Sequence, residues 1–189
     1  MNLRRWCSLC LAVLLGCASP LWAATSFQYT LPGTPITFAD SAQSPTYTFT
    51  LSALGNGAGQ YSARADKGTG AQPSLWQLSC HLQLTGTNVV AAALELYIAH
   101  WDSAGANSDG ALGTTTASLA TDKRRNLKLV GLLIVDQTST NVTMSTNIAN
   151  IYIPGRYFSL AIWNGTSLPL KTDTAVHGCA MTPMPNQMQ

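Results

Sequence analysis

Charged side chains are scarce in this chain. They make up 10% of its 189 residues, and Glu95 is the single glutamate. Ten Lys and Arg residues stand against eight Asp and Glu residues, and the excess of two equals the contribution of Arg4 and Arg5 near the N-terminus. A coiled coil, a charged disordered tail or a basic arm would need far more charge. The composition therefore excludes an electrostatic footprint for DNA or RNA.

The chain also lacks the sequence motifs of common catalytic sites. It contains neither the G-x-S-x-G pattern of a serine nucleophile nor an S-x-x-K motif with its partners. Its three histidines, His81, His100 and His177, are scattered and form no H-x-H pair, so they do not predict a metal site. We expect no enzymatic activity and no cofactor; the weakest alternative is a secreted hydrolase that uses Asp102 or Asp109.

No apolar run is long enough to span a bilayer. Residues 1–23 instead have the pattern of a secretory signal peptide, with two arginines, an apolar run from Leu9 to Leu15 and small residues at the end. Cleavage after Ala23 would start the mature chain at Ala24. A second interpretation is a bacterial lipoprotein box at residues 14–17, and a third is a start codon assigned too far upstream.

Removal of this segment would also remove three of the five cysteines and leave Cys80 and Cys179. The two residues could form a disulfide in an exported chain, and closing so long a loop would stabilise the fold by several kcal/mol. They could equally be two buried thiols that pack as small apolar residues. The sequence leaves both possibilities open.

Apolar and polar residues alternate along much of the remaining chain, between short stretches of Gly, Pro, Asn and Asp. The clearest alternation runs from Thr46 to Ala53, and a second, from Trp76 to Leu84, places His81 on the solvent side. Three further segments are nearly continuously apolar, which is typical of strands covered on both faces. These segments are Val89 to Ile98, Leu127 to Val135 and Tyr157 to Trp163.

Shorter strand candidates fill the remaining chain. They are Phe27 to Leu31, Ile36 to Ala39, Gln60 to Ala65, Asn150 to Ile153 and Ala175 to Met181. No stretch supports a helix longer than two or three turns, and no break in composition divides the chain. We therefore predict an all-β protein in which residues 24–189 form a single jelly-roll or β-sandwich domain of about nine or ten strands.

The stretch of residues 102–122 is the one long excursion between predicted strands, and long loops often carry function. Asp102, Asn107 and Asp109 offer the hard oxygen ligands that calcium prefers. Their spacing does not match an EF-hand, however. We favour a solvated turn cluster in which these side chains serve backbone geometry, with no bound metal.

A basic cluster follows this loop and directly precedes an apolar strand. Its residues are Lys123, Arg124 and Arg125. A gatekeeper role or a salt bridge to a neighbouring subunit suits such a position better than nucleic-acid binding. Together with Asp102 and Asp109 in the loop, we expect these residues to meet a neighbouring molecule.

Two tryptophans stand at strand ends beside loops. Trp101 and Trp163 could stack on sugar rings in a carbohydrate-binding sandwich, although packing in the core or at an interface is the stronger interpretation. Two N-x-T patterns begin at Asn141 and Asn164 and match the glycosylation acceptor motif. We interpret these asparagines as turn residues.

Six short patterns along the chain are informative together. They are Tyr61 to Arg64, Leu94 to Ala99, Asp109-Gly110, Lys123 to Leu127, Ile153 to Tyr157 and Thr182 to Pro185. They resemble small all-β proteins from the structural modules of tailed phages and prophages, of the head-decoration or minor virion type. The resemblance covers residues 60–189. It implies a β-sandwich that assembles through its edges and surfaces, as a trimer or on a symmetric lattice, with a capsid or other virion protein as partner.

The N-terminal pattern departs from this family, because virion proteins assembled in the cytoplasm have no use for a signal peptide. Our preferred expectation is a non-enzymatic virion decoration or minor capsid protein located in the virion. The alternative is a periplasmic, secreted or lipid-anchored bacterial binding module, with carbohydrate as one possible ligand. We expect neither a nucleic-acid partner nor a membrane span.

Overall fold

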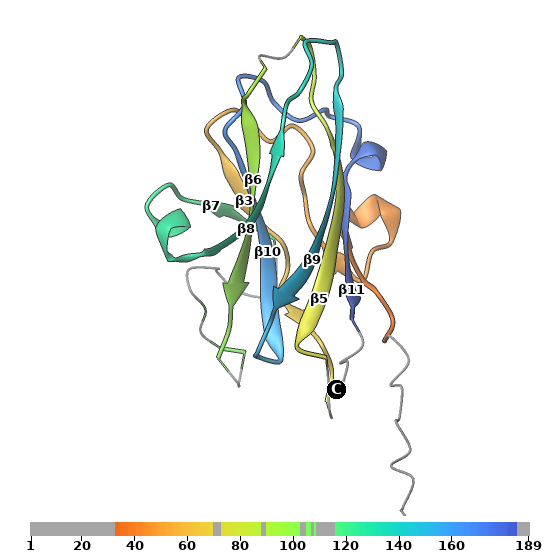
Figure 1. Cartoon of the computed structure of the whole chain (residues 1–189), viewed down its shortest axis with the longest axis vertical. Helices are drawn as coiled ribbons and strands as arrows, with labels where there is room; N and C mark the ends of the chain where they lie inside the picture. Colours follow the sequence, from red (N-terminus) through yellow and green to blue (C-terminus); the bar gives the residue numbers. More distant parts are fainter. Residues whose placement is uncertain are drawn as a thin grey trace, which may run out of the picture. The chain divides into compact units, whose positions relative to one another are not determined.

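Two β-sheets face each other across a shared apolar layer in the computed structural model of the chain (Figure 1). The structure describes residues 33–69, 73–87, 90–102, 105–106, 108 and 116–184. Within these residues it has eleven strands and three short 3-10 helices, and they belong to one compact unit. The prediction of an all-β sandwich is confirmed. The jelly-roll alternative stays a prediction, and the expected strand at Phe27 to Leu31 lies outside the described residues.

The first sheet contains five strands. Their order is β2 (Tyr47–Thr48), β1 (Ile36–Ala39), β11 (Gly178–Pro183), β5 (Leu75–Gln83) and β9 (Thr143–Tyr152). The β1–β2 pair is parallel, and the other pairs are antiparallel. Along β5 the residues from Trp76 to Leu82 are alternately buried and more exposed, and His81 is exposed. The period-two pattern of this segment therefore predicted both the strand and the face that it buries.

The second sheet contains six strands. Five follow the order β7 (Ala117–Leu119), β3 (Gly59–Tyr61), β10 (Tyr157–Asn164), β6 (Ala93–His100) and β8 (Lys128–Ile134), and the sixth, β4 (Ala65–Asp66), also pairs with β10. Strand β10 is central and buried from Phe158 to Asn164. Its continuously apolar sequence is explained by this position, because both of its faces are covered.

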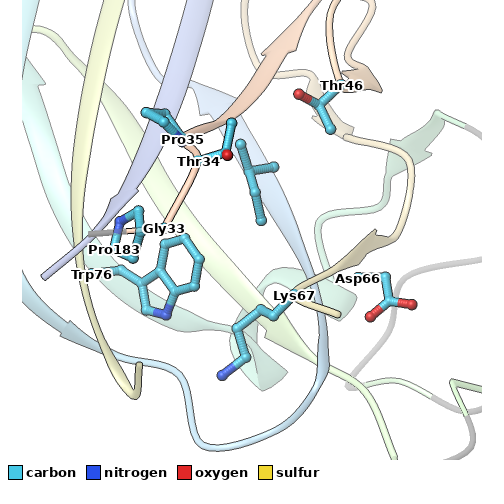
Figure 2. Close-up of a pocket in the computed structure, with 9 residues that line it drawn as sticks. Gly33, Thr34, Pro35, Thr46, Asp66, Lys67, Trp76 and Pro183 are labelled. Atoms are coloured by element: carbon cyan, nitrogen blue, oxygen red, sulfur yellow. The ribbon is translucent and has the colours of Figure 1, made fainter. Parts of the chain in front are cut away.

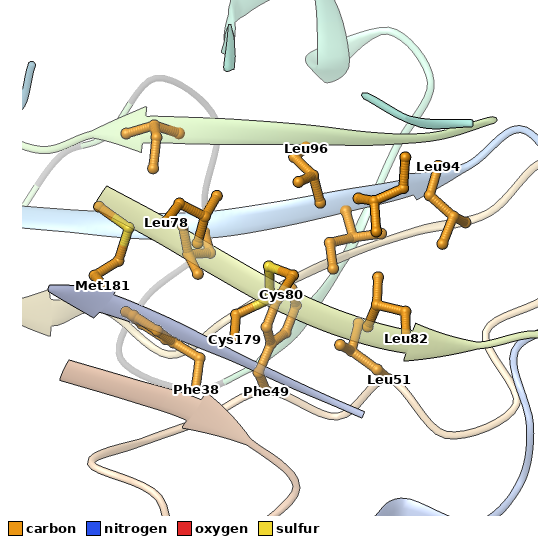
Figure 3. Packing of buried hydrophobic residues seen from close by; sticks show 14 of the residues in the cluster. Phe38, Phe49, Leu51, Leu78, Cys80, Leu82, Leu94, Leu96, Cys179 and Met181 are labelled. Carbon is orange, nitrogen blue, oxygen red and sulfur yellow. A yellow bond between two sulfur atoms is a disulfide. The ribbon is translucent and has the colours of Figure 1, made fainter. Parts of the chain in front are cut away.

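Aromatic and aliphatic side chains from both sheets fill the space between them (Figure 3). Phe38 of the first sheet lies edge-on to Phe158 of the second, with ring centroids 5.9 Å apart. Trp76 contacts the same ring from β5, with centroids 6.2 Å apart. These contacts fix the two sheets to each other, since aromatic pairs add to the burial of apolar area.

A second, smaller apolar cluster lies on the opposite face of the six-stranded sheet. Its members are Tyr61, Tyr97, Ala99, Leu119, Leu127, Ala161 and Trp163. Leu119 is the last residue of β7, and Leu127 directly follows the 3-10 helix η2 (Lys123–Asn126). The chain after the long loop therefore covers part of this outer face. The cluster explains why β6 and β10 are buried on both sides.

Two expectations about strands need correction. Leu127 to Val135 is not covered on both faces, because Leu129, Leu132 and Ile134 in β8 are 51%, 47% and 57% exposed. Strand β8 is the last strand of its sheet, so its outer side has no neighbouring strand. In the stretch from Thr46 to Ala53 only Tyr47–Thr48 forms a strand, although alternate residues beyond it are buried.

Other boundaries also differ from expectation. Strand β9 extends over ten residues, although only its end had been predicted as a strand. The segment Gln60 to Ala65 divides between β3 and β4, and the segment Ala175 to Met181 between a 3-10 helix, η3 (Thr174–Val176), and β11. Long-range pairing, and not local alternation, determines these limits.

Candidate functional site

Both tryptophans proposed for sugar stacking are buried. Trp101 and Trp163 are each 7% exposed. The Trp101 Nε1–H donates a hydrogen bond to the Ser159 hydroxyl oxygen at 2.9 Å, and the Arg64 guanidinium lies 5.4 Å from the centroid of the Trp101 ring. Neither ring presents an open face to solvent. Their burial argues against sugar stacking and agrees with packing, the interpretation that the sequence favoured.

Arg124 is directed toward its own sheet. Its guanidinium lies 4.5 Å from the centroid of the Trp163 ring and forms an ion pair with Glu95 at 3.1 Å. The Tyr97 hydroxyl donates to the same carboxylate. Burial, reinforced by this hydrogen bond to Glu95, raises the pKa of Tyr97 to about 12. The charge pair thus holds the 3-10 helix η2 against the outer face of the sheet.

The three basic residues therefore do not act as one patch. Arg124 is committed to Trp163 and Glu95, Lys123 is half-buried and Arg125 is exposed. The expectation that the three residues meet a neighbouring molecule stays a prediction, and the internal contacts of Arg124 make Lys123 and Arg125 the better candidates.

Replacing Arg124 by alanine tests this assignment against a neighbouring control. We expect Arg124→Ala to lower the free energy of unfolding by about 1 kcal/mol, because a cation–π contact and a half-buried ion pair are lost together. Arg125→Ala removes an exposed side chain and should change stability by no more than about 0.5 kcal/mol. Urea unfolding of both variants measures the difference, and equal losses would contradict the inward role of Arg124.

Asp102 has the turn role that was favoured for it. Its Oδ1 accepts a hydrogen bond from the backbone N–H of Ala106 at 2.8 Å, and its carbonyl accepts one from Gly105 at 3.0 Å. Asn107 and Asp109 lie outside the described residues. Among the residues that the structure describes, no group of three or more His, Cys, Asp or Glu side chains could hold a metal ion.

Cys80 and Cys179 form a disulfide (Figure 3). They stand directly opposite each other on β5 and β11, with their Cα atoms 4.1 Å apart. The bond connects adjacent strands within the first sheet and closes a loop with a sequence separation of 99. Of the two possibilities that the sequence left open, the pair of free thiols is therefore wrong.

His177 is held as a neutral imidazole beneath the same sheet. It is 2% exposed, its Nδ1 accepts from the backbone N–H of Gln83 at 3.3 Å, and its Nε2 lies 2.8 Å from the carbonyl oxygen of Lys171. Since a carbonyl can only accept, Nε2 carries the proton. Burial, with a smaller contribution from His81, lowers the pKa of His177.

This arrangement predicts a loss of stability in mild acid. In the unfolded chain His177 titrates near 6.5, whereas its folded pKa is lower, so the unfolded state binds more protons below that value. Stability should be complete above about pH 6.5 and should fall as the pH decreases toward the folded pKa. Urea unfolding between pH 7.5 and pH 5 measures this slope.

A pair of variants separates His177 from other titrating groups. His177→Gln should flatten the slope, although it also lowers stability at neutral pH. The exposed His81→Gln removes only the smaller contribution to the pKa of His177 and should leave most of the slope in place. Asp66 has a pKa lowered by its hydrogen bonds from Arg156, so its contribution is lost only below its ordinary value of 3.8. A slope between pH 7.5 and 5 that survives in His177→Gln would contradict the assignment.

A pocket of about 390 Å³ opens beside Trp76 (Figure 2). Its charged side chains already have partners. The Asp66 carboxylate accepts two hydrogen bonds from Arg156, at 2.7 and 2.6 Å, and the Lys67 Nζ donates to the carbonyl of Ile153 at 2.7 Å. These groups stabilise the end of the sandwich, and we assign no ligand to the pocket.

The most unusual surface of the described residues is the outer strand of the second sheet. Of five exposed large hydrophobic residues, three lie on β8, namely Leu129, Leu132 and Ile134. We call these three residues the β8 edge. Lys128, the first residue of β8, and Asp136, two residues after its last, carry opposite charges, and both side chains are exposed. Exposed apolar residues that gather in one place mark interaction surfaces more often than scattered ones do.

The other edge strands in the described sheets are less suited to association. Strands β2 and β7 have two and three residues, and short edge strands resist pairing with another chain. Strand β9 is long, but its exposed positions are mainly Thr, Ser and Asn. It contacts β8 where Ile148 lies against Gly131, and a groove of about 190 Å³ opens nearby. The β8 edge is therefore the best candidate for a functional surface.

Comparison of the chain with protein-family models, with curated proteins and with solved structures gives no match. Among the described residues, no helix is long and apolar enough to cross a membrane. The functional proposal therefore rests on the geometry of the sandwich.

Proposed function

We propose that this chain is a non-enzymatic structural protein that acts by association, and that it decorates a phage-type virion or forms a minor part of its capsid. The observation that carries the proposal is the β8 edge, on which Leu129, Leu132 and Ile134 are about half exposed to solvent. Monomeric proteins usually cover or charge such an edge strand, because its unpaired backbone groups can pair with another chain. In a protein that assembles, the same exposed strand can serve as the interface.

The rest of the sandwich is suited to a passive structural role. The outer face of strands β3, β6 and β10 is covered by its own apolar cluster, and the disulfide connects two neighbouring strands of the other sheet. Low charge, with 10% charged residues, suits an interface in which few ionic groups must lose water. A rigid scaffold of this kind loses little conformational freedom when it binds.

A second candidate function is an exported or lipid-anchored bacterial binding module. The Cys80–Cys179 disulfide favours it, because disulfides form and persist in oxidising compartments. The signal-like pattern of residues 1–23 agrees with that setting. Carbohydrate is not a favoured ligand in this candidate, since Trp101 and Trp163 are buried. A protein partner that binds the β8 edge fits the surface better.

One experiment separates the two candidates. The protein is isolated from its native source in separate fractions of cells, medium and induced phage particles, and each fraction is characterised by intact mass and N-terminal sequencing. Recovery in purified particles supports the virion proposal. A chain that begins at Ala24 in periplasm or medium, or one that carries a lipid on Cys17, overturns it in favour of the exported module.

A further inference from the structure

We propose that the partner of the β8 edge is a second copy of this chain, and that two β8 strands pair antiparallel about a two-fold axis at Leu132. The pairing would join the six-stranded sheets of two protomers into one continuous sheet. This inference rests on the proposed function and adds the identity of the partner. It also replaces the expected trimer with a two-fold contact at this surface.

The backbone of β8 has the orientation that such pairing needs. The N–H of Val135 donates to the carbonyl of Ala92 at 2.8 Å, and the Val135 carbonyl accepts from Ala91 at 2.9 Å. Both polar groups of Val135 therefore point toward β6. Since successive residues of a strand alternate, the N–H and C=O groups of Leu132 and Ile134 point away from β6. In a two-fold pair, Leu132 of each copy can donate to and accept from Leu132 of the other.

The charges at the ends of β8 are self-complementary about this axis. Lys128 precedes Leu132 by four residues, and Asp136 follows it by four. An antiparallel pair centred on Leu132 therefore brings the Lys128 end of each strand to the Asp136 end of the other, so that two symmetric ion pairs can form. The described residues form two ion pairs within the chain, Arg124 with Glu95 and Arg156 with Asp66. Neither includes Lys128 or Asp136. A parallel arrangement would instead place like charges together.

The two-fold symmetry limits the association to a dimer, and a bulge in β8 opposes further growth of the sheet. The register with β6 shifts between Leu129 and Gly131. Bulges bend an edge strand and interrupt pairing, which opposes open-ended growth of the sheet. In a Leu132-centred pair this shift places Lys128 opposite Val135 of the other copy, and the long lysine side chain reaches Asp136 from the neighbouring position. A two-fold contact uses the same surface on both copies, so it closes after two protomers.

The side chains favour a second copy over an unrelated strand. Leu132 and Ile134 alternate with the buried Leu133 and Val135, so both project from the outer face of the sheet. Antiparallel pairing brings the two Leu132 side chains together. Because Val130 is the bulged residue, the pairing places Ile134 of each copy beside Leu129 of the other, which lies opposite Tyr97 of the outer cluster. Cross-strand apolar pairs of this kind stabilise a sheet.

The first test is the oligomeric state of the purified full chain, measured by sedimentation equilibrium across a range of concentrations. We expect a monomer–dimer equilibrium. Leu132→Lys places two like charges against each other at the axis, and it should leave only monomer where the unchanged protein is dimeric. Tyr152→Lys is the matched control, because Tyr152 is 51% exposed on β9 and should not affect the dimer. Thermal unfolding of both variants is the check that they keep the fold.

Charge reversal tests the register itself. Lys128→Glu alone and Asp136→Lys alone should each raise the dissociation constant by about tenfold or more, because each creates two like-charged pairs. The double variant restores opposite charges and should return the constant to within about threefold of the original value. Failure of the double variant to recover would overturn the Leu132-centred register.

Three other outcomes would overturn the inference in different ways. A chain that is monomeric at every concentration excludes the second copy, and its recovery in particles or bound to another protein would still support the proposed function. A dimer that Leu132→Lys leaves intact places the contact on another surface. A third outcome is that the full chain is monomeric and a variant without residues 24–32 forms a dimer through β8. In that case the chain's own N-terminal segment is the occupant of the β8 edge, and the inference fails.

Discussion

Replacing both Cys80 and Cys179 by alanine is expected to lower the free energy of unfolding by about 4–5 kcal/mol. The disulfide closes a loop with a sequence separation of 99, and a cross-link of that span removes a large number of conformations from the unfolded chain. The two buried sulfur atoms also pack in the main core, so their removal leaves a small cavity. A loss of this size is a large part of the stability of a typical domain.

Urea unfolding of the double variant measures the loss, and reduction of the unchanged protein supplies the control. The reduced protein keeps both sulfur atoms, so it should lose the cross-link contribution but not the contribution of packing. Any difference between the two losses therefore reports the cavity alone. An unfolding midpoint that does not move on complete reduction would show that the disulfide adds nothing to stability.

The stability of the reduced protein also indicates whether the chain can stay folded in a reducing compartment. The β5 and β11 strands that the bond connects are adjacent and already paired through six positions, from Gly178 opposite His81 to Pro183 opposite Trp76. Hydrogen bonds of the ladder can therefore hold these strands together without the bond. We expect the reduced protein to remain folded at moderate temperature, with a lowered midpoint of thermal unfolding. Such a chain tolerates a reducing cytoplasm but is better suited to an oxidising compartment.

The contrast between β10 and β8 shows how far the sequence alone could lead. Tyr157 to Trp163 and Leu127 to Val135 are both nearly continuously apolar, and both were predicted to be covered on two faces. That expectation is confirmed for β10 and wrong for β8. Apolarity reports that a segment can be buried, whereas its place in the sheet depends on pairing between distant strands. Lys128 and Gly131 interrupt the second run and were the available signal that it differs from the first.

The candidate site depended even more on distant contacts. Arg124 and Glu95 are separated by 29 positions, and only the return of η2 over the sheet brings them together beside Trp163. No local pattern predicts that return, so the basic cluster appeared as one surface. By contrast, the alternation around Cys80 correctly placed that residue on the buried face of β5. The alternation within β5 predicted the buried face correctly, whereas features that depend on the path of the loops or on the position of a strand in its sheet were not predicted.

Asn164→Ala is expected to lower the free energy of unfolding by about 3–5 kcal/mol, because its side chain holds together the turn that leaves β10. Asn164 is fully buried. Its Nδ2 donates to the carbonyls of Leu54 and Leu168, at 3.0 and 2.9 Å. Its Oδ1 accepts from the backbone N–H and the hydroxyl of Thr166, at 3.0 and 2.6 Å. The variant would leave several buried polar groups without these hydrogen bonds.

The second N-x-T pattern of the chain provides the matched control. Asn141 is exposed and has a positive φ of 58°, so Asn141→Gly keeps a backbone conformation that glycine adopts without strain. We expect that variant to change stability by no more than about 0.5 kcal/mol. Urea unfolding compares the two, and similar values would contradict the structural role of Asn164. The same geometry makes the Asn164 amide inaccessible to a glycosylating enzyme, so an exported form of the folded protein should carry no glycan there, whereas the exposed Asn141 has no such protection.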